Sequence, residues 1–506
     1  SAEAPRMQAS SNRIFPRTEP SSMQRALSLF VGVLAAAHGA VSLRLSPEPA
    51  SFATEGEVPP EAVARKQRQV MYNFQDVQYY SYITIGGQAI TGLLDTGSFD
   101  LVVFDHSCTD CGKAGKYASR QSKSFRAGKL TQSLYYGSGG VEVEEAFDNV
   151  EIGPFSSVNL SFWDGVSASM PVLQNARFQS IIGVGPPETS GSDAWNVVQH
   201  DWKQAEADLK QGPDFLDAQT GEGILRGVDL AWELSTQPTL IRAEGITRFS
   251  ICLGQKPGSP GYFIWNDTDF VDNPSAYTYI KVLGKHTWTV KMTNIHLSSG
   301  HKQDLLDCAD GCGAIVDSGT SFLLMPYSAI AKLRQTLIAG DADCSNLKSL
   351  PTLTFTLDGK EFSLPPDAYI AHMTGTMTMS GPSPSVGTKF PSLTAERVPL
   401  DIGKGDCQLS VMGSGSYTNW GPLWILGMPF FRKYYTSFET GRNRDERGLY
   451  IAAASSNCTP VPLAGTVAME RERVREQQGL RTLNRSNIFI PRIAQKAMTQ
   501  SFVADL

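Results

Sequence analysis

The chain carries one short motif twice, and each copy sets a carboxylate between an apolar run and small hydroxyl residues. Leu93-Leu-Asp95-Thr-Gly-Ser98 recurs as Ile315-Val-Asp317-Ser-Gly-Thr320, with the two aspartates 222 residues apart. A pair of hydrophobic residues and a glycine follows each copy, as Ile181-Ile-Gly183 and as Ile425-Leu-Gly427. An internal repeat of this kind predicts two similar units, each presenting one aspartate.

A single copy has a plain structural interpretation, because Asp-x-Gly-Ser is common turn chemistry. Two copies in matching contexts favour a functional one. If the two units pack about a pseudo-twofold axis, Asp95 and Asp317 meet, and two carboxylates that close cannot both ionise. We therefore expect them to share one proton and to titrate as a pair.

Such a pair can hydrolyse an acyl or peptide bond without a covalent intermediate. The ionised carboxylate removes a proton from a bound water, and the protonated partner donates to the carbonyl oxygen. The residues expected to support the pair are hydroxyls that orient the carboxylates and glycines that allow close backbone approach: Thr96, Gly97, Ser98, Ser318, Gly319 and Thr320. This chemistry requires no metal and no cofactor.

The sequence lacks the motifs of serine hydrolases, zinc proteases and phosphate-binding loops. It contains no Gly-x-Ser-x-Gly elbow and no His-Glu-x-x-His motif. Gly112-Lys-Ala-Gly-Lys116 lacks the spacing and the terminal Ser or Thr of a phosphate-binding loop.

The elements that must position the aspartates read as β-strands. From Tyr72 onward, short alternating apolar runs are separated by clusters of Gly, Pro, Asn or Ser, which is typical of an all-β protein. Clear examples of such runs are residues 80–85, 141–152, 249–253 and 277–282. Helical patterns are few: residues 193–209, 327–338 and a charged stretch at 468–481, for which we expect a solvated surface helix or a disordered tail.

The composition and net charge exclude some overall states and functions. A chain of 506 residues with 41% hydrophobic and 19% charged residues can bury a large core, which excludes overall disorder. Two or three domains are expected at this length. With 44 basic and 50 acidic residues, the net charge of -6 provides no basic field to recruit nucleic acid or an anionic membrane.

The N-terminal region has the pattern of a secretory signal peptide. A basic residue at Arg25 precedes the apolar run 26–37, and small residues then allow cleavage after Gly39 or Ser42. The alternative is an uncleaved membrane anchor, although Gly32 and His38 lower the hydrophobicity of this run. We assign residues 1–42 to an N-terminal extension with this signal, and residues 43–72 to a linker or removable pro-segment.

Eight cysteines behind a signal peptide indicate disulfides. Cys108-x-x-Cys111 and Cys308-x-x-x-Cys312 raise the alternative of a zinc site, but no His or Cys pair stands at finger spacing near either. Four Asn-x-Ser/Thr triplets fit passage through the secretory pathway, at Asn159, Asn266, Asn457 and Asn484.

Taken together, these motifs resemble those of the pepsin-like aspartic proteases, a family with paired catalytic carboxylates. The resemblance runs from about Tyr79 to Ala454. The matching segments, in family order, are Asp95-Thr-Gly-Ser98, Tyr135-Tyr-Gly-Ser-Gly139, Ser180-Ile-Ile-Gly-Val184, Phe249-Ser-Ile-Cys-Leu253, the stretch from Cys308 to Ser321, and Trp424-Ile-Leu-Gly427 followed by Phe430-Phe-Arg-Lys-Tyr-Tyr435. The resemblance implies a bilobal all-β fold with a substrate cleft between the lobes. It also implies an endopeptidase for polypeptides that favours acid and is made as a zymogen held by its own pro-segment.

By the same resemblance, residues 73–246 form the lobe with Asp95 and a flap that has Tyr136 at its tip, followed by Gly137. Residues 247–458 form the lobe with Asp317, and the tail 459–506 has no counterpart in the family. The implied disulfides are Cys108–Cys111, Cys308–Cys312 and Cys344–Cys407. Cys252 and Cys458 remain, on segments that resemble neighbouring strands of the sheet joining the lobes, so a fourth bridge is expected.

The sequence departs from the family pattern in three places. The family usually has a Trp seven residues after its first catalytic Asp, bonded to the flap Tyr, where this chain has Val102. Phe99 is bulkier than the usual Ser. Both changes concern the flap and the pocket beside it. Residues 186–246 are longer than a compact member needs and suggest a surface insertion.

Two other functions stay open at this point. One is a catalytically silent binding protein that keeps the cleft, which the loss of either aspartate would favour. The other is a membrane-tethered processing protease, which follows if the apolar segment near residues 25–43 is not cleaved. Otherwise we expect the protein in the secretory pathway, either secreted or in an acidic endosome-like or vacuole-like compartment.

Overall fold

A computed structural model describes residues 65–187, 227, 238–376, 400–465, 467–477, 479–499 and 503–504. The predicted signal peptide, the predicted helix at 193–209 and most of the expected insertion at 186–246 lie outside these residues. Ala53–Ser190 and Ser235–Leu506 belong to one compact unit. The description below concerns that unit.

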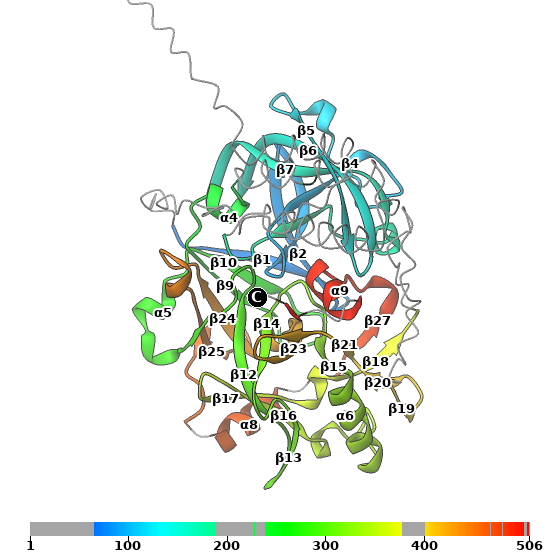
Figure 1. Cartoon of the computed structure of the whole chain (residues 1–506), viewed down its shortest axis with the longest axis vertical. Helices are drawn as coiled ribbons and strands as arrows, with labels where there is room; N and C mark the ends of the chain where they lie inside the picture. The colour runs from blue at the N-terminus through cyan, green and yellow to red at the C-terminus, as the bar shows by residue number, and fades with distance from the viewer. Residues whose placement is uncertain are drawn as a thin grey trace, which may run out of the picture. The chain divides into compact units, whose positions relative to one another are not determined.

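The larger sheet of this unit has 14 strands and spans both halves of the sequence (Figure 1). Its order is β11-β25-β24-β9-β10-β1-β2-β3-β8-β4-β7-β6-β5, with β26 paired to β25. The strands of the first half are β1 (Gln67–Phe74), β2 (Gln78–Ile85), β3 (Gln88–Asp95), β4 (Leu101–Thr109), β5 (Arg126–Tyr136), β6 (Gly139–Ile152), β7 (Phe155–Ser169) and β8 (Ser180–Gly183). Those of the second half are β9 (Arg248–Cys252), β10 (Gly261–Trp265), β11 (Thr278–Lys281), β24 (Tyr434–Glu439), β25 (Gly448–Ala454) and β26 (Pro460–Val461).

Two smaller sheets complete the second half. The ten-stranded one contains β12 (Thr289–Ser299), β13 (Lys302–Asp307), β14 (Cys312–Val316), β15 (Leu323–Pro326), β16 (Thr352–Leu357), β17 (Lys360–Leu364), β21 (Val411–Ser414), β22 (Tyr417–Thr418), β23 (Gly421–Leu426) and β28 (Val503–Ala504). The four-stranded one orders β19 (Asp401–Lys404), β20 (Cys407–Leu409), β18 (Ile370–Thr374) and β27 (Thr482–Asn484). The all-β, two-lobed prediction is confirmed.

Helices are short and few in the described part of the chain. The α-helices are α4 (Leu240–Ala243), α5 (Asp269–Asp272), α6 (Tyr327–Ala339), α7 (Met428–Phe431), α8 (Val467–Glu476) and α9 (Arg492–Thr499). The 3₁₀ turns are η1 (Ser119–Gln121), η2 (Pro171–Gln174), η4 (Pro274–Ala276), η5 (Leu347–Ser349), η6 (Pro366–Ala368), η7 (Arg444–Glu446) and η8 (Arg485–Asn487). The helix predicted at 327–338 is α6, which forms because Ile330, Leu333 and Leu337 recur at helical spacing and bury one face.

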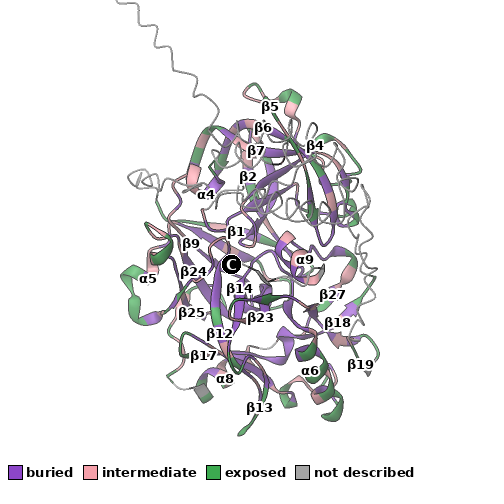
Figure 2. Cartoon of the chain, in the orientation of Figure 1, coloured by how far each residue is buried: buried purple, intermediate pink, exposed green. Residues whose placement is uncertain are grey.

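Burial follows the strand pattern that the sequence indicated. Along β6, buried residues alternate with partly or fully exposed ones over most of its length, as a strand covered on one face requires. In contrast, β8 and β14 are buried at every residue, which places the strands nearest the repeated motif inside the core. Figure 2 shows this buried interior, with exposed residues on the outside of the fold, for example around α5, on α6 and at the outer end of β13.

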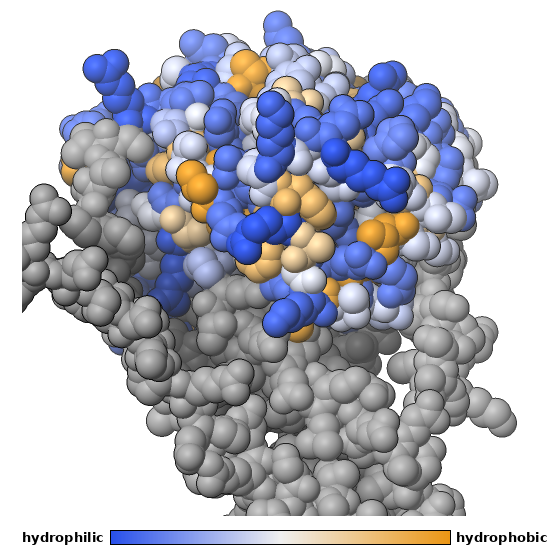
Figure 3. All heavy atoms as spheres, turned by 90° about the horizontal axis from the view of Figure 1, so that it is seen from above, coloured by the Kyte–Doolittle hydropathy of each residue, from blue (hydrophilic) through white to orange (hydrophobic). Residues whose placement is uncertain are grey.

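The outer face of the first half is polar. Figure 3 shows this face, which is uppermost in Figure 1, with hydrophobic residues in small groups among hydrophilic ones. Scattered apolar residues of this kind are normal on a soluble surface.

The repeated motif builds the same local structure in both halves. β3 runs parallel to β8, with Asp95 opposite Gly183, and β14 runs parallel to β23, with Val316 opposite Leu426. The glycine that closes each hydrophobic pair is required by close packing. A methyl group on Gly183 would lie 2.5 Å from the Asp100 nitrogen, and one on Gly427 would lie 2.4 Å from the Thr320 oxygen.

Both ends of the described chain pack against the body of the fold. β1 lies between β10 and β2, so the last residues of the predicted pro-segment, 67–72, belong to a strand of the large sheet. The charged stretch at 468–481 forms α8, which ends at Glu476. It is solvated on one side only: Met469 is 59% exposed, whereas Val474 is buried. Of the two expectations, α8 corresponds to the surface helix, and its buried Val474 attaches it to the rest of the fold.

Candidate active site

Asp95 and Asp317 lie side by side. Their carboxyl groups are close enough to interact directly, and both residues have 0% exposure. The glycine of each motif lies against the carboxylate of the other: a methyl group on Gly97 would be 2.8 Å from Asp317 Oδ1, and one on Gly319 would be 2.2 Å from Asp95 Oδ1. The structure thus brings together the two aspartates that the repeat singled out.

Matching donors orient each carboxylate. The Gly97 amide donates to Asp95 Oδ1 at 3.0 Å, and the Ser98 hydroxyl donates to Asp95 Oδ2 at 2.6 Å. In the second copy, the Gly319 amide donates to Asp317 Oδ1 at 2.9 Å, and the Thr320 hydroxyl donates to Asp317 Oδ2. Because each donor repeats at the same position of the motif, the two carboxylates sit in near-identical cradles.

The hydroxyls of Thr96 and Ser318 act differently from what we expected. They do not bond to the carboxylates but cross between the two halves. The Thr96 hydroxyl donates to the Val316 carbonyl at 3.0 Å and accepts from the Ser318 amide at 2.9 Å. The Ser318 hydroxyl donates to the Leu94 carbonyl at 2.6 Å and accepts from the Thr96 amide at 3.2 Å. These four bonds fix the separation of the two motifs rather than the orientation of the carboxylates.

Burial and neighbouring groups shift the pKa values of both aspartates. Burial raises the pKa of both carboxyl groups above their ordinary value. The charge of Asp95 raises the pKa of Asp317 further, well above its usual range. Hydrogen bonds from Asp317, Ser98 and the Gly97 amide counter the rise in the pKa of Asp95. The two carboxyl groups therefore titrate as one coupled pair, with both pKa values raised.

The expected flap is the hairpin of β5 and β6. Tyr136 pairs with Gly139 across it, and Gly137 and Ser138 form its two-residue turn. The Tyr136 side chain is buried, which raises the pKa of its hydroxyl. Within the described residues this hydroxyl has no hydrogen-bond partner. Val102 is fully buried in β4, opposite Trp163 of β7.

Sequence reasoning missed the tail residues that lie at this flap. The ring centroid of Phe489 lies 5.6 Å from that of Tyr136, and the Gly137 amide donates to the Ile490 carbonyl at 3.0 Å. Arg492 forms an ion pair with the buried Asp100 at 2.8 Å. The signal in the sequence was the apolar run from Ile488 to Pro491, which follows the polar stretch 484–487.

The cysteines form the four expected pairs. Disulfides join Cys108 to Cys111, Cys252 to Cys458, Cys308 to Cys312 and Cys344 to Cys407. Neither short-spaced pair therefore offers free thiolates to zinc.

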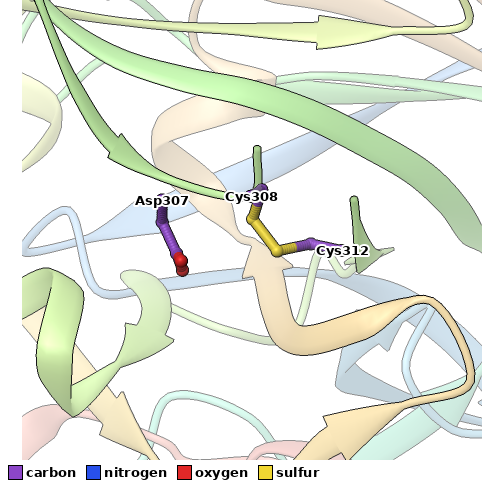
Figure 4. A group of neighbouring side chains, drawn as sticks. All are labelled: Asp307, Cys308 and Cys312. Atoms are coloured by element: carbon purple, nitrogen blue, oxygen red, sulfur yellow. A yellow bond between two sulfur atoms is a disulfide. The ribbon is translucent and has the colours of Figure 1, made fainter. Parts of the chain in front are cut away.

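One trio of potential metal ligands stands close together in the part of the chain that the structure describes: Asp307, Cys308 and Cys312. Figure 4 shows the two sulfur atoms of this trio bonded to each other, beside the Asp307 carboxylate. That carboxylate accepts a hydrogen bond from the Trp424 indole at 3.1 Å. The trio is thus a disulfide next to a partnered carboxylate.

No helix among the described residues is both long and apolar enough to cross a membrane.

Comparisons with known proteins identify relatives over most of the sequence. A family model described as eukaryotic aspartyl protease matches residues 78–229 and 237–384. Pepsin A of Bos taurus is 27% identical over 397 residues, which cover 76% of this chain and 87% of that protein. Pepsin A of Sus scrofa is 26% identical over 398 residues, covering 76% and 84%. Pepsin II-2/3 of Oryctolagus cuniculus is 26% identical over 409 residues, covering 78% and 86%.

Proposed function

This chain belongs to the eukaryotic aspartyl protease family, and we propose that Asp95 and Asp317 are the pair that performs its chemistry. The protein is an aspartic endopeptidase, a hydrolase that cleaves peptide bonds in polypeptides. The observation that carries this assignment is geometric: the two buried carboxyl groups face each other from matching motifs, and each accepts the same pair of hydrogen bonds.

In the proposed reaction, Asp95 is the general base and Asp317 the general acid. Asp95 takes a proton from a water held between the two carboxyl groups, and the water oxygen bonds to the carbonyl carbon of the substrate. Asp317 gives its proton to the carbonyl oxygen in the same step. When the tetrahedral intermediate collapses, Asp95 passes its proton to the leaving nitrogen and Asp317 recovers a proton from the hydroxyl. The pair ends as it began, with one proton.

The surrounding residues have supporting roles in this proposal. Ser98 and Thr320 keep the carboxylates oriented, because each donates a hydrogen bond to Oδ2 of its aspartate. Thr96 and Ser318 hold the two motifs at a fixed separation through bonds to the opposite backbone. Tyr136 and Gly137 of the flap contact the substrate, the first through its ring and the second through its amide.

The working state needs one proton on two carboxyl groups, so we propose that activity favours acidic pH. We also propose that the enzyme matures in the secretory pathway, where disulfides persist, with residues 43–72 acting as an inhibitory pro-segment. The exposed Asn159 and Asn457 are the sequons best placed for glycosylation. Membrane attachment follows only if the N-terminal apolar segment stays uncleaved, which N-terminal sequencing of the mature protein decides.

Replacing either aspartate tests the assignment. Asp95→Asn and Asp317→Asn are nearly isosteric, and each should lower kcat for a peptide substrate by roughly 10³-fold or more while the protein still folds. The matched control is Asp310→Asn, at an exposed aspartate, which should keep full activity. Retention of most activity in either active-site variant would contradict the assignment. If the unaltered protein binds a statine peptide but hydrolyses nothing at any pH, it is a silent binding protein instead.

A further inference from the structure

Residues 487–493 of the C-terminal tail, called the tail segment below, pair through their backbone with the turn of the flap. The Gly137 amide donates to the Ile490 carbonyl at 3.0 Å. The Ile490 amide donates to the Ser138 hydroxyl at 2.8 Å, and that hydroxyl donates to the Ile488 carbonyl at 3.4 Å. Pairing of an extended segment with a hairpin through main-chain groups is a common way in which proteins bind peptides.

The side chains of this segment fit the flap closely. Phe489 is 1% exposed and packs against two aromatic rings, those of Tyr136 and Phe178, with centroid distances of 5.6 Å to each. A methyl group on Gly137 would lie 2.3 Å from Ile490 Cγ2. The flap turn therefore meets the tail with no space left for a side chain at its glycine.

A charge pair joins the segment to the loop after Asp95. The Arg492 guanidinium donates to Asp100 Oδ2 at 2.8 Å, and both side chains are mostly buried. The positive charge of the same guanidinium opposes the rise that burial causes in the pKa of Asp95. The segment thus reaches the neighbourhood of the aspartate pair as well as the flap.

Contacts with the second half of the chain hold this segment from both sides. Before it, the buried Arg481 donates to the Gln255 carbonyl at 2.6 Å, and β27 pairs with β18. After it, the Ser414 and Ser416 hydroxyls donate to the Ala497 carbonyl at 2.7 and 2.9 Å. Figure 1 shows β27 and α9 in red beside β18 and β21. The tail therefore crosses from the second half of the chain to the flap of the first.

We propose that residues 487–493 occupy the substrate site and compete with substrate, as an inhibitor built into the C-terminal tail. This inference rests on the proposed function, in which the flap amide and the Tyr136 ring contact the substrate. The Gly137 amide already bonds to Ile490, and the ring of Tyr136 already packs on that of Phe489. A substrate peptide can reach both groups only when the tail leaves. The ligand class is an extended peptide that places an aromatic side chain against Tyr136 and Phe178.

Steady-state kinetics separate competition from a structural role. If only a fraction of molecules has the tail released, the apparent KM is raised by the inverse of that fraction, while saturating substrate displaces the tail and leaves kcat unchanged. Phe489→Ala removes a buried aromatic contact of the tail, so KM for a peptide substrate should fall by about tenfold or more at constant kcat. Arg492→Gln should lower KM severalfold. Met469→Ala, at an exposed position of α8, is the matched control and should leave KM unchanged.

Hydrogen exchange on the unaltered chain provides a second measurement that does not depend on how the variants fold. Saturation with a statine peptide should increase amide exchange in residues 486–495, because the probe displaces the tail, and should leave exchange in α6 unchanged. Unchanged KM in both variants, or an unchanged tail in the saturated complex, overturns the inference while the protease assignment stands. If no form of the chain hydrolyses a peptide or binds the statine probe, the proposed function fails first and the inference with it.

Discussion

At the scale of single residues, the flap residue Tyr136 lacks the indole that usually bonds to its hydroxyl in this family. The position that usually supplies an indole to this hydroxyl is Val102, a fully buried aliphatic residue of β4. The Tyr136 ring instead packs against Phe489. Its contribution to substrate binding should therefore come mainly from the ring.

Two substitutions separate the ring from its hydroxyl. Tyr136→Phe should cost less than about 1.5 kcal/mol in kcat/KM, the upper range for a neutral hydrogen bond, whereas Tyr136→Ala should cost more because it deletes an apolar wall. Both are best measured in a Phe489→Ala background, so that release of the tail does not mask the loss. Equal damage from the two changes would mean that the hydroxyl has a fixed partner in the working enzyme.

The raised pKa of Asp164 in β7 makes the stability of the protein depend on pH. Burial raises its pKa to about 8, and the nearby Asp105 and Glu144 add to the shift. A raised pKa means that the folded state holds a proton that the unfolded chain releases near pH 4. The contribution of this residue to stability is therefore full below about pH 4 and is lost as the pH rises to about 8.

Asp164→Asn keeps the side chain neutral at every pH. It should raise the free energy of unfolding by about 1 to 4 kcal/mol near pH 7.5 and change it little near pH 4. Denaturant titrations at the two pH values measure the difference, with Glu151→Gln on the exposed side of β6 as the control. A difference of the same size at both pH values would show that Asp164 does not titrate as described.

At the scale of elements, the strands were predictable because they follow two patterns: alternation where one face is covered, as in β6, and a short apolar run where both faces are buried, as in β9. Alternation along residues 141–152 corresponds to β6, and the runs at 80–85 and 249–253 correspond to β2 and β9. The contact of the tail with the flap left no comparable pattern. Ser138 and Ile488 are 350 residues apart, and neither carries a periodic signal that names the other. Pairing across such a separation depends on the folded arrangement of both partners.

The bridge between Cys252 and Cys458 ties β9 to the segment after β25 and closes a loop of 206 residues. Replacing both cysteines with serine should lower the free energy of unfolding by about 5 kcal/mol in the chain-entropy model. The Cys108–Cys111 bridge spans three residues, and its removal should cost only about 2 kcal/mol. If removal of either bridge lowered the free energy of unfolding equally, the stabilisation would not depend on loop length. Alkylation of both Cys252 and Cys458 in the native protein would show that they are not bonded to each other.

At the scale of the whole molecule, the repeat was the most informative feature of the sequence. It singled out Asp95 and Asp317 by residue type and spacing alone, because two copies of one turn motif have little reason to recur without a shared task. It did not reveal the different tasks of the four hydroxyls. Ser98 and Thr320 bond to carboxylates, while Thr96 and Ser318 bond across to opposite backbones. A hydroxyl beside an aspartate can bond either to the carboxylate of its own motif or to the backbone of the other motif. Which of the two it does depends on how the two halves pack together.

The pH dependence of kcat/KM for a peptide substrate tests the shared proton most directly. If Asp95 must be ionised and Asp317 protonated, the profile is a bell with its maximum in acid, and its two limbs report the two titrations of the pair. A statine peptide should bind most tightly near the same maximum, since it addresses the same protonation state. A kcat/KM that stays flat from about pH 4 to pH 8 would contradict the shared-proton mechanism.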